Sequence, residues 1–322
     1  MAKKHQSDIT LANLIAVVGI VLLMAAFVLG FLYSGDTLGI SIAKGVGLGC
    51  AFALLLWLLI KAKSADSYLK GWRIVEGITL VVYLALAVLT SCVMMKFINI
   101  YVQKSDIQST ALNDIDAIRQ EIEHFKDVEG TNINSLSDKL SEVVSLGTER
   151  YDTSVRRVLE KCLPDTNVEE IDEDNIDQNV RDFYLEKIKE VSSDNGWEEQ
   201  LDDCSGKISS WNILEVPQHI KSIPVLAEEV TAKLNELSED IPCYDIEDDG
   251  HVYTAREGQK ESYSAETEID SKMKKAELSP WGIGACVLIH LLILFNYFVT
   301  SRTDRRRPVR NTDWAKSGQS LQ

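Results

Sequence analysis

The chain reads LANLIAVVGIVLLMAAFVLGFLY from Leu11 to Tyr33, and this stretch contains no charged residue. A hydrocarbon core about 30 Å thick is crossed by roughly 20 helical residues. Lipid offers no hydrogen bonds to the backbone, so a segment that crosses it must be helical. Three further stretches are long and apolar enough to cross: about 38–60, about 74–95 and Trp281–Thr300. The sequence therefore predicts an all-α membrane protein with four transmembrane helices.

Charge is divided unequally along the 322 residues. The whole chain has 33 Lys and Arg against 49 Asp and Glu, a net charge of −16. Residues 100–280 carry a net −24, and the rest of the chain carries +8. Because the basic part is also the apolar part, this division favours a membrane protein with an acidic domain outside the lipid. The negative excess also argues against nucleic-acid binding.

The acidic region 100–280 is long enough to form one domain with its own core. Its apolar residues repeat at intervals of three and four, a spacing that buries one face of a helix. Six such stripes run from Ala111 to Phe125, Tyr151 to Cys162, Ile176 to Val191, Trp197 to Ile208, Leu226 to Ile241 and Ile269 to Ala276. We therefore expect a mostly helical bundle inserted between the third and fourth transmembrane helices.

Glycine and proline predict where these helices end. The predicted breaks are at Gly130, Pro164, Asn195-Gly196, a connector between Pro217 and Pro224, and Pro242. The polar segment Tyr244–Ser264 is expected to be a long loop or a partly ordered excursion. The third transmembrane helix is expected to continue unbroken to about residue 128, and the alternative is a break near Lys104–Asp106.

Lysine and arginine in the short flanks predict the orientation. They occur in residues 1–10, in the loop between the second and third spans and in the tail 301–322, whereas the loop Ser34–Thr37 has none. Both termini should therefore be cytoplasmic, with residues 100–280 periplasmic or extracellular. The first apolar stretch is too long for a secretory signal and is expected to remain as an uncleaved span.

The chain contains no Asn-x-Ser/Thr sequon. A eukaryotic outer domain of this size would often carry one, so we expect the plasma (inner) membrane of a bacterium. The layout of a short outer loop, a short inner loop and a large outer domain resembles that of the tetraspanins. The Cys-Cys-Gly motif of that family is missing from the large outer region.

Two polar pairs are predicted inside the spans. His290 is at the middle of the fourth span, and a rise of about 1.5 Å per residue puts it level with Tyr83. Ionisable groups inside a bilayer mark functional sites by default. His290 is therefore interpreted either as a proton or ligand site or as a neutral imidazole that hydrogen-bonds Tyr83 and joins two helices. Glu76 lies near the expected depth of Asn296, which predicts a second contact.

Small residues recur every four positions in the second span, at Ser41, Gly45, Gly49 and Ala53. Such residues let two helices approach closely. The stripe predicts a close helix contact, either within the four-helix bundle or with another chain.

The outer region contains three cysteines, Cys162, Cys204 and Cys243. An odd number leaves at least one thiol free or paired with another chain. Cys162 and Cys204 lie on apolar stripes, so we first expect buried core thiols. One internal disulfide and an inter-chain bridge through Cys243 are the alternatives.

Sequence motifs give little support to catalysis. The chain has no phosphate-binding loop, serine-hydrolase motif, zinc-protease motif or Cys-x-x-Cys. Asp245-x-Glu247-x-Asp249-Gly250 begins like a calcium-binding loop, but the twelfth position is Arg256 instead of a bidentate Glu. No metal and no cofactor are therefore expected.

The function expected from these features is that of a non-enzymatic scaffold or accessory subunit of an envelope complex. Its partners would be the lipid bilayer and other membrane or envelope proteins, with a homo-oligomer as a further option. A receptor-like sensor and a transporter or channel subunit are the alternatives. The basic tail predicts contact with anionic lipid or with a cytoplasmic partner, through Arg305, Arg306, Arg307 and Arg310.

Overall fold

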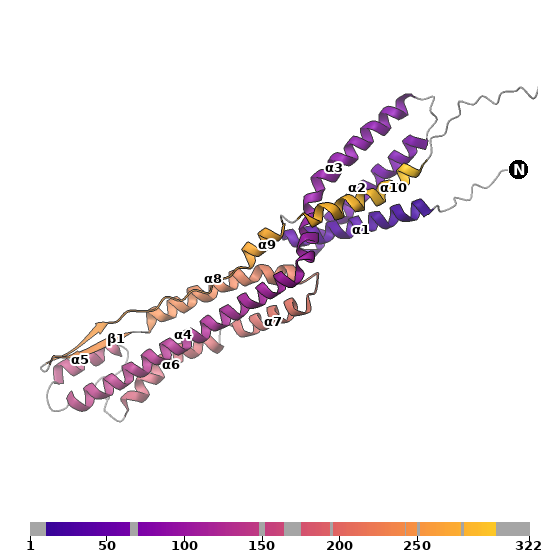
Figure 1. The fold of residues 1–322 in the computed structure, drawn as a ribbon. Helices are drawn as coiled ribbons and strands as arrows, with labels where there is room; N and C mark the ends of the chain where they lie inside the picture. The colour runs from indigo at the N-terminus through magenta and orange to yellow at the C-terminus, as the bar shows by residue number, and fades with distance from the viewer. Residues whose placement is uncertain are drawn as a thin grey trace, which may run out of the picture. The chain divides into compact units, whose positions relative to one another are not determined.

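The computed structural model describes residues 11–64, 70–147, 152–163, 175–193, 196–241, 243–249, 252–277 and 280–300. The chain divides into two compact units (Figure 1). The membrane unit comprises Met1–Lys104 and Met273–Gln322, and the acidic unit comprises Ser105–Lys272.

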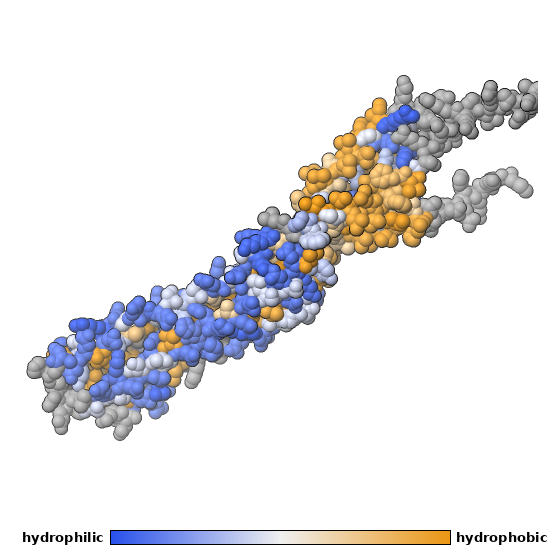
Figure 2. Space-filling model, in the orientation of Figure 1, coloured by the Kyte–Doolittle hydropathy of each residue, from blue (hydrophilic) through white to orange (hydrophobic). Residues whose placement is uncertain are grey.

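The membrane unit contains the four predicted spans as helices. They are α1 (Leu11–Ser34), α2 (Leu38–Ser64), α3 (Lys70–Val102) and α10 (Trp281–Val299). Each is long and apolar enough to cross a membrane, and hydrophobic side chains cover these helices in Figure 2. Inside the bundle the rings of Phe27 and Phe52 are 5.9 Å apart, and Phe52 is 5.1 Å from Tyr83. These contacts join α1, α2 and α3 around an aromatic core.

The acidic unit is mostly helical, as the apolar stripes predict. It is built from α4 (Lys104–Gly147), α5 (Asp152–Cys162), α6 (Ile176–Ser193), α7 (Trp197–Ser210) and α8 (Val216–Asp240), followed by β1 (Tyr244–Asp248), β2 (Tyr253–Glu257) and the start of α9 (Ile269–Glu277). Buried side chains recur every three or four residues along α4, from Ile107 to Leu140. Figure 1 shows α4 as the longest helix of the unit, with α8 running beside it.

The predicted end of the first outer helix at Gly130 is wrong, because α4 continues to Gly147. Ile133, Leu136 and Leu140 extend its buried face beyond the glycine. An interior glycine costs about 1 kcal/mol relative to alanine. That cost is small compared with about 1.5–3 kcal/mol for each large apolar side chain that the helix buries.

The predicted connector between Pro217 and Pro224 is also helical. Pro217 lies in the first turn of α8, where its missing N–H has no helical acceptor. Pro224 lies inside the same helix. Ile220, Ile223 and the residues after them are buried, so the apolar face extends across the proline and outweighs the single lost hydrogen bond.

The segment expected to be a long loop contains an antiparallel hairpin. Tyr244 of β1 is opposite Glu257 of β2, and Asp248 is opposite Tyr253. Both strands are largely exposed, so the alternation of polar and apolar residues that marks a half-buried strand is weak. Asp245 and Glu247 therefore lie on a strand rather than in a calcium-binding loop, and Glu247 forms an ion pair with Arg256.

The unbroken helix expected from the third span is interrupted at Gln103. α3 ends at Val102 and α4 begins at Lys104, so the interruption is one residue before the break considered from sequence. The predicted helix ends at Pro164, Asn195 and Pro242 lie outside the described residues, whereas Gly196 separates α6 from α7 with a φ of 62°.

Candidate functional site

The structure brings His290 and Tyr83 together in the middle of the membrane unit. The Tyr83 hydroxyl lies 3.1 Å from His290 Nδ1, at the depth that the helical rise predicts. The Phe52 ring packs against both, with centroid distances of 5.1 Å to Tyr83 and 5.3 Å to His290. Tyr83 is fully buried. The pair thus links α3 to α10 beside the aromatic core.

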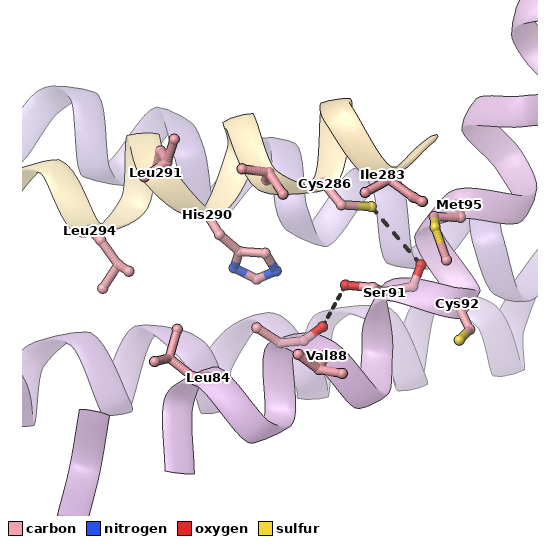
Figure 3. Close-up of a pocket in the computed structure, with 12 residues that line it drawn as sticks. Leu84, Val88, Ser91, Cys92, Met95, Ile283, Cys286, His290, Leu291 and Leu294 are labelled. Atoms are coloured by element: carbon pink, nitrogen blue, oxygen red, sulfur yellow. Dashed lines mark hydrogen bonds between the residues drawn. The ribbon is translucent and has the colours of Figure 1, made fainter. Parts of the chain in front are cut away.

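The His290 ring also borders a groove of about 500 Å³ between α3 and α10 (Figure 3). The groove walls are mainly apolar. They are formed by Leu84, Ala87, Val88, Ser91, Cys92 and Met95 of α3 and by Ile283, Cys286, Val287, His290, Leu291 and Leu294 of α10. Val88, Val287 and Leu291 are more than half exposed. The groove therefore opens on the outer face of the bundle, where lipid would lie.

A second polar cluster lies at the end of the bundle where α3 begins and α10 ends. Glu76 is only 6% exposed and accepts a hydrogen bond of 2.7 Å from the Tyr297 hydroxyl. Asn296 instead donates to Asn13 Oδ1 over 2.7 Å. The predicted contact between Glu76 and Asn296 is thus replaced by one with the next residue of α10. Counting residues along a span predicts the depth of a side chain in the membrane to within about one residue. The count does not predict the rotation of the helix about its axis.

Two asparagines of the membrane unit have roles that the sequence reasoning missed. Asn13 of α1 receives the Asn296 amide, and Asn99 of α3 is fully buried. The Asn99 side-chain oxygen accepts the backbone N–H of Gly282 over 2.7 Å. It therefore satisfies one of the free donors at the start of α10. The sequence signal that could have identified both residues is an asparagine within an otherwise apolar stretch.

The small-residue stripe of α2 packs against α1 of the same chain. Ser41, Gly45 and Gly49 are buried, and Ala53 is half-buried. A Cβ on Gly45 would lie 2.7 Å from the backbone nitrogen of Val28, and one on Gly49 would overlap Met24. Of the two alternatives left open by the sequence, contact within the bundle is the one that the structure contains.

Cys162, Cys204 and Cys243 are free thiols in the structure, which therefore does not contain the internal disulfide. The inter-chain bridge through Cys243 stays a prediction. Cys162 and Cys204 are buried, as their positions on apolar stripes predict. Cys204 Sγ is 3.5 Å from His219 Nδ1 and 3.4 Å from Ser222 Oγ. A thiol beside an imidazole is the arrangement of cysteine nucleophiles, but Cys204 is only 6% exposed, which closes the sulfur to substrates.

We expect the Cys162 thiol to resist alkylation while the protein is folded. Burial raises its pKa to about 12, so at pH 8 the thiolate, which is the reacting form, is about a thousandfold scarcer than for an ordinary thiol. Because the pKa of Cys162 is higher in the folded protein than in the unfolded one, the buried neutral thiol adds to the free energy of unfolding below pH 9. This contribution is lost as the pH rises towards 12. Iodoacetamide treatment at pH 8, followed by peptide mass spectrometry, tests this expectation.

The half-buried Cys243 is the internal comparison, and the same sample unfolded in urea is the control. Cys243 should be modified in the folded protein, and Cys162 only after unfolding. Equal alkylation rates for Cys162 in folded and unfolded samples would contradict the expected burial.

The remaining predicted positions add no further site. The basic tail, Arg305, Arg306, Arg307 and Arg310, lies outside the described residues. Among the residues that are described, no group of three or more His, Cys, Asp or Glu is placed to hold a metal ion. The polar pair and groove around His290 are therefore the candidate site that the structure defines best. Comparison with protein-family models, curated proteins and solved structures finds no match to this chain.

Proposed function

We propose that this chain is a non-enzymatic membrane scaffold or accessory subunit of an envelope complex, with the acidic unit displayed outside the cytoplasm. The observation that supports it most is the division of charge, a net −24 in residues 100–280 against +8 elsewhere. The cytoplasmic placement of both termini follows from the positions of Lys and Arg in the flanks of the apolar helices.

Several basic side chains of the acidic unit are engaged in pairs with its own carboxylates. Arg119 contacts Asp116 and Asp202, and Lys207 contacts Glu215. The surplus on the surface is therefore negative. It includes four exposed residues on α7 and α8, namely Glu198, Glu199, Glu228 and Glu229. A surface of one sign attracts a partner of the other sign and speeds its association.

The internal contacts of the unit also support a presenting role. Asn235 pairs with the backbone of Tyr263 in both directions, and Glu121 accepts the backbone N–H of Ser264. Polar side chains thus hold the extended segment 258–268 against α4 and α8. Groups used in this way fix the shape of the surface and are not available for catalysis.

The proposal is tested by purifying the tagged full chain from its native membrane in a mild detergent. Mass spectrometry at low and high salt identifies the companions. We expect stoichiometric proteins with a basic surface, held less well at high salt because ions screen exposed charges beyond about 10 Å at 0.1 M. The variant with Glu198, Glu199, Glu228 and Glu229 all changed to Lys should lose them.

The matched control changes the same four residues to Gln, which removes charge without reversing it and should give intermediate retention. A pure homo-oligomer or monomer would contradict the proposal. Companions retained equally by the Lys variant would also contradict the role of the acidic surface.

A receptor-like sensor is the second candidate. It is favoured by the short connection between α3 of the membrane unit and α4 of the acidic unit, which Gln103 alone separates in the sequence. Its output would pass through the tail 301–322 to a separate cytoplasmic partner. Removing residues 301–322 should abolish that interaction, and an unchanged set of companions would exclude this candidate.

A further inference from the structure

The hairpin of β1 and β2 in the acidic unit (Figure 1) has one edge that no described strand covers. Gly258 N–H donates to the Cys243 carbonyl over 2.7 Å, so these two residues form a hydrogen-bonded pair of the ladder. In an antiparallel ladder such pairs alternate with residues whose N–H and C=O point away from the partner strand. By this register, Tyr244 and Ile246 direct their backbone groups away from β2.

The outer edge of β2 is covered, whereas that of β1 is open. Lys161 of α5 donates to the Ala255 carbonyl over 2.9 Å, on the side of β2 that faces away from β1. Within the described part of the chain, no hydrogen bond uses the backbone N–H or C=O of Tyr244 or Ile246. A row of unpaired backbone groups on an exposed strand is a template for a further strand. β1 is therefore the edge at which a strand can be added.

The charges on β1 select the strand that can be added. Asp245, Glu247 and Asp248 are exposed carboxylates within its five residues. Asp245 pairs with Lys139 and Glu247 with Arg256, yet these four side chains are all at least 37% exposed, so the carboxylates can meet another cation. Pairing β1 with β1 of a second copy would set carboxylates against carboxylates, and like charges directly opposite are destabilising. The edge thus favours a basic strand from a different protein.

We propose that β1 accepts an antiparallel strand from a partner protein, in which basic side chains alternate with apolar ones. The basic residues lie opposite Asp245 and Glu247, at positions without ladder hydrogen bonds, where Cα atoms are only about 4.5 Å apart. The apolar residues lie opposite Tyr244 and Ile246, on the face of β1 from which the Tyr244 hydroxyl donates to the Lys161 carbonyl of α5. The proposal rests on the proposed scaffold role, because it names the segment by which a basic partner is held.

The binding test uses the full chain in nanodiscs of zwitterionic lipid, which does not attract basic peptides as anionic lipid does. The probe is a fluorescent peptide, Lys-Val-Lys-Val-Lys-Val-Lys, whose binding is followed by fluorescence anisotropy. We expect saturable binding that weakens at high salt, because ions screen exposed charges. The peptide with Glu in place of every Lys should bind at least tenfold more weakly.

Two N-methylated peptides of equal charge separate strand addition from simple charge attraction. In the proposed register the valine N–H groups point to β1, and the lysine N–H groups point to solvent. Methylation of the valine nitrogens should weaken binding at least tenfold, because it removes the donors of the new ladder. Methylation of the lysine nitrogens should leave the affinity nearly unchanged.

A variant of the edge tests the same ladder from the side of the protein. Ile246→Pro removes the outward N–H and should weaken binding at least tenfold. Proline is tolerated on an edge strand where the missing N–H faces solvent, so the hairpin should remain folded. Ile246→Ala keeps the N–H and is the matched control, with nearly unchanged affinity expected. Hydrogen exchange of residues 253–257 checks that both variants retain the hairpin.

Four results would overturn the proposal. The first is no saturable binding of the lysine peptide, and the second is equal affinity of the two methylated peptides, which would leave charge attraction only. The third is unchanged affinity of Ile246→Pro. The fourth is a dimer of the full chain that Ile246→Pro abolishes, which would make a second copy the occupant. The peptide test needs no native companion, so its failure is distinct from a failure to find the companions of the proposed scaffold.

Discussion

Gly45→Leu should lower the melting temperature of the membrane unit strongly, whereas Gly47→Leu, two residues away on the same helix, should be tolerated. A Cβ on Gly45 would lie 2.5 Å from Val28 Cγ2 and 2.7 Å from the Val28 backbone nitrogen. The obstacle includes backbone, so α1 and α2 would have to separate. Overpacking of this kind costs about 1–3 kcal/mol, and the close approach of these helices is what small residues permit in lipid.

Gly47 provides the matched control for helix propensity and added volume. It is exposed, and nothing lies within 4 Å of the Cβ that a substitution would add. Leucine at that position faces lipid, where it is favoured. Gly45→Ala should give an intermediate loss of about 2 kcal/mol, within the range expected for overpacking. The measurement is thermal unfolding of the detergent-solubilised protein, and equal melting of the Gly45→Leu and Gly47→Leu variants would contradict the contact between α1 and α2.

The sequence predicted the features of the membrane unit that depend on depth and polarity. Hydropathy located all four helices because lipid imposes one requirement, about 20 apolar residues with a paired backbone. Depth also brought His290 level with Tyr83. The number of residues from the end of a span gives depth but not rotation about the helix axis. The sequence therefore predicted a contact of Glu76 with Asn296, whereas the structure pairs Glu76 with Tyr297. The same limit hid Asn13 and Asn99, whose partners lie far away in the chain.

The errors in the acidic unit came from treating local signals as decisive. Gly130 and Pro224 disfavour a helix at single positions, yet α4 and α8 pass through them because apolar residues on both sides are buried by tertiary packing. The extended segment 258–268 has no periodicity to detect. Its place is fixed by polar side chains of α4 and α8, such as Glu121 and Asn235, which a one-dimensional pattern does not connect to it.

Glu129→Ala should destabilise the acidic unit by about 3 kcal/mol. Glu129 is 2% exposed, and its Oε1 accepts hydrogen bonds from Ser238 Oγ at 2.8 Å and Tyr263 Oη at 2.9 Å. Asn132 donates to Oε2 over 3.2 Å. Alanine would leave these donors without an acceptor in the core, and each buried group left unsatisfied costs roughly 1–3 kcal/mol. Burial, and after it the Glu129 carboxylate, raises the pKa of Tyr263, so the hydroxyl stays a donor.

The loss should be localised, because Tyr263 belongs to the extended segment that Glu129 anchors between α4 and α8. Hydrogen exchange of the full chain in urea should show faster exchange for peptides covering residues 258–268. Glu123→Ala is the matched control on α4, since Glu123 is exposed and, among the described residues, forms a single surface ion pair with Lys126, worth at most about 1 kcal/mol. Replacing Glu129, Ser238 and Tyr263 together by Leu, Ala and Phe should cost less than Glu129→Ala alone, because the two buried hydroxyl donors are then removed together with their acceptor. If the triple variant is instead the less stable of the two, packing rather than hydrogen bonding holds the segment in place.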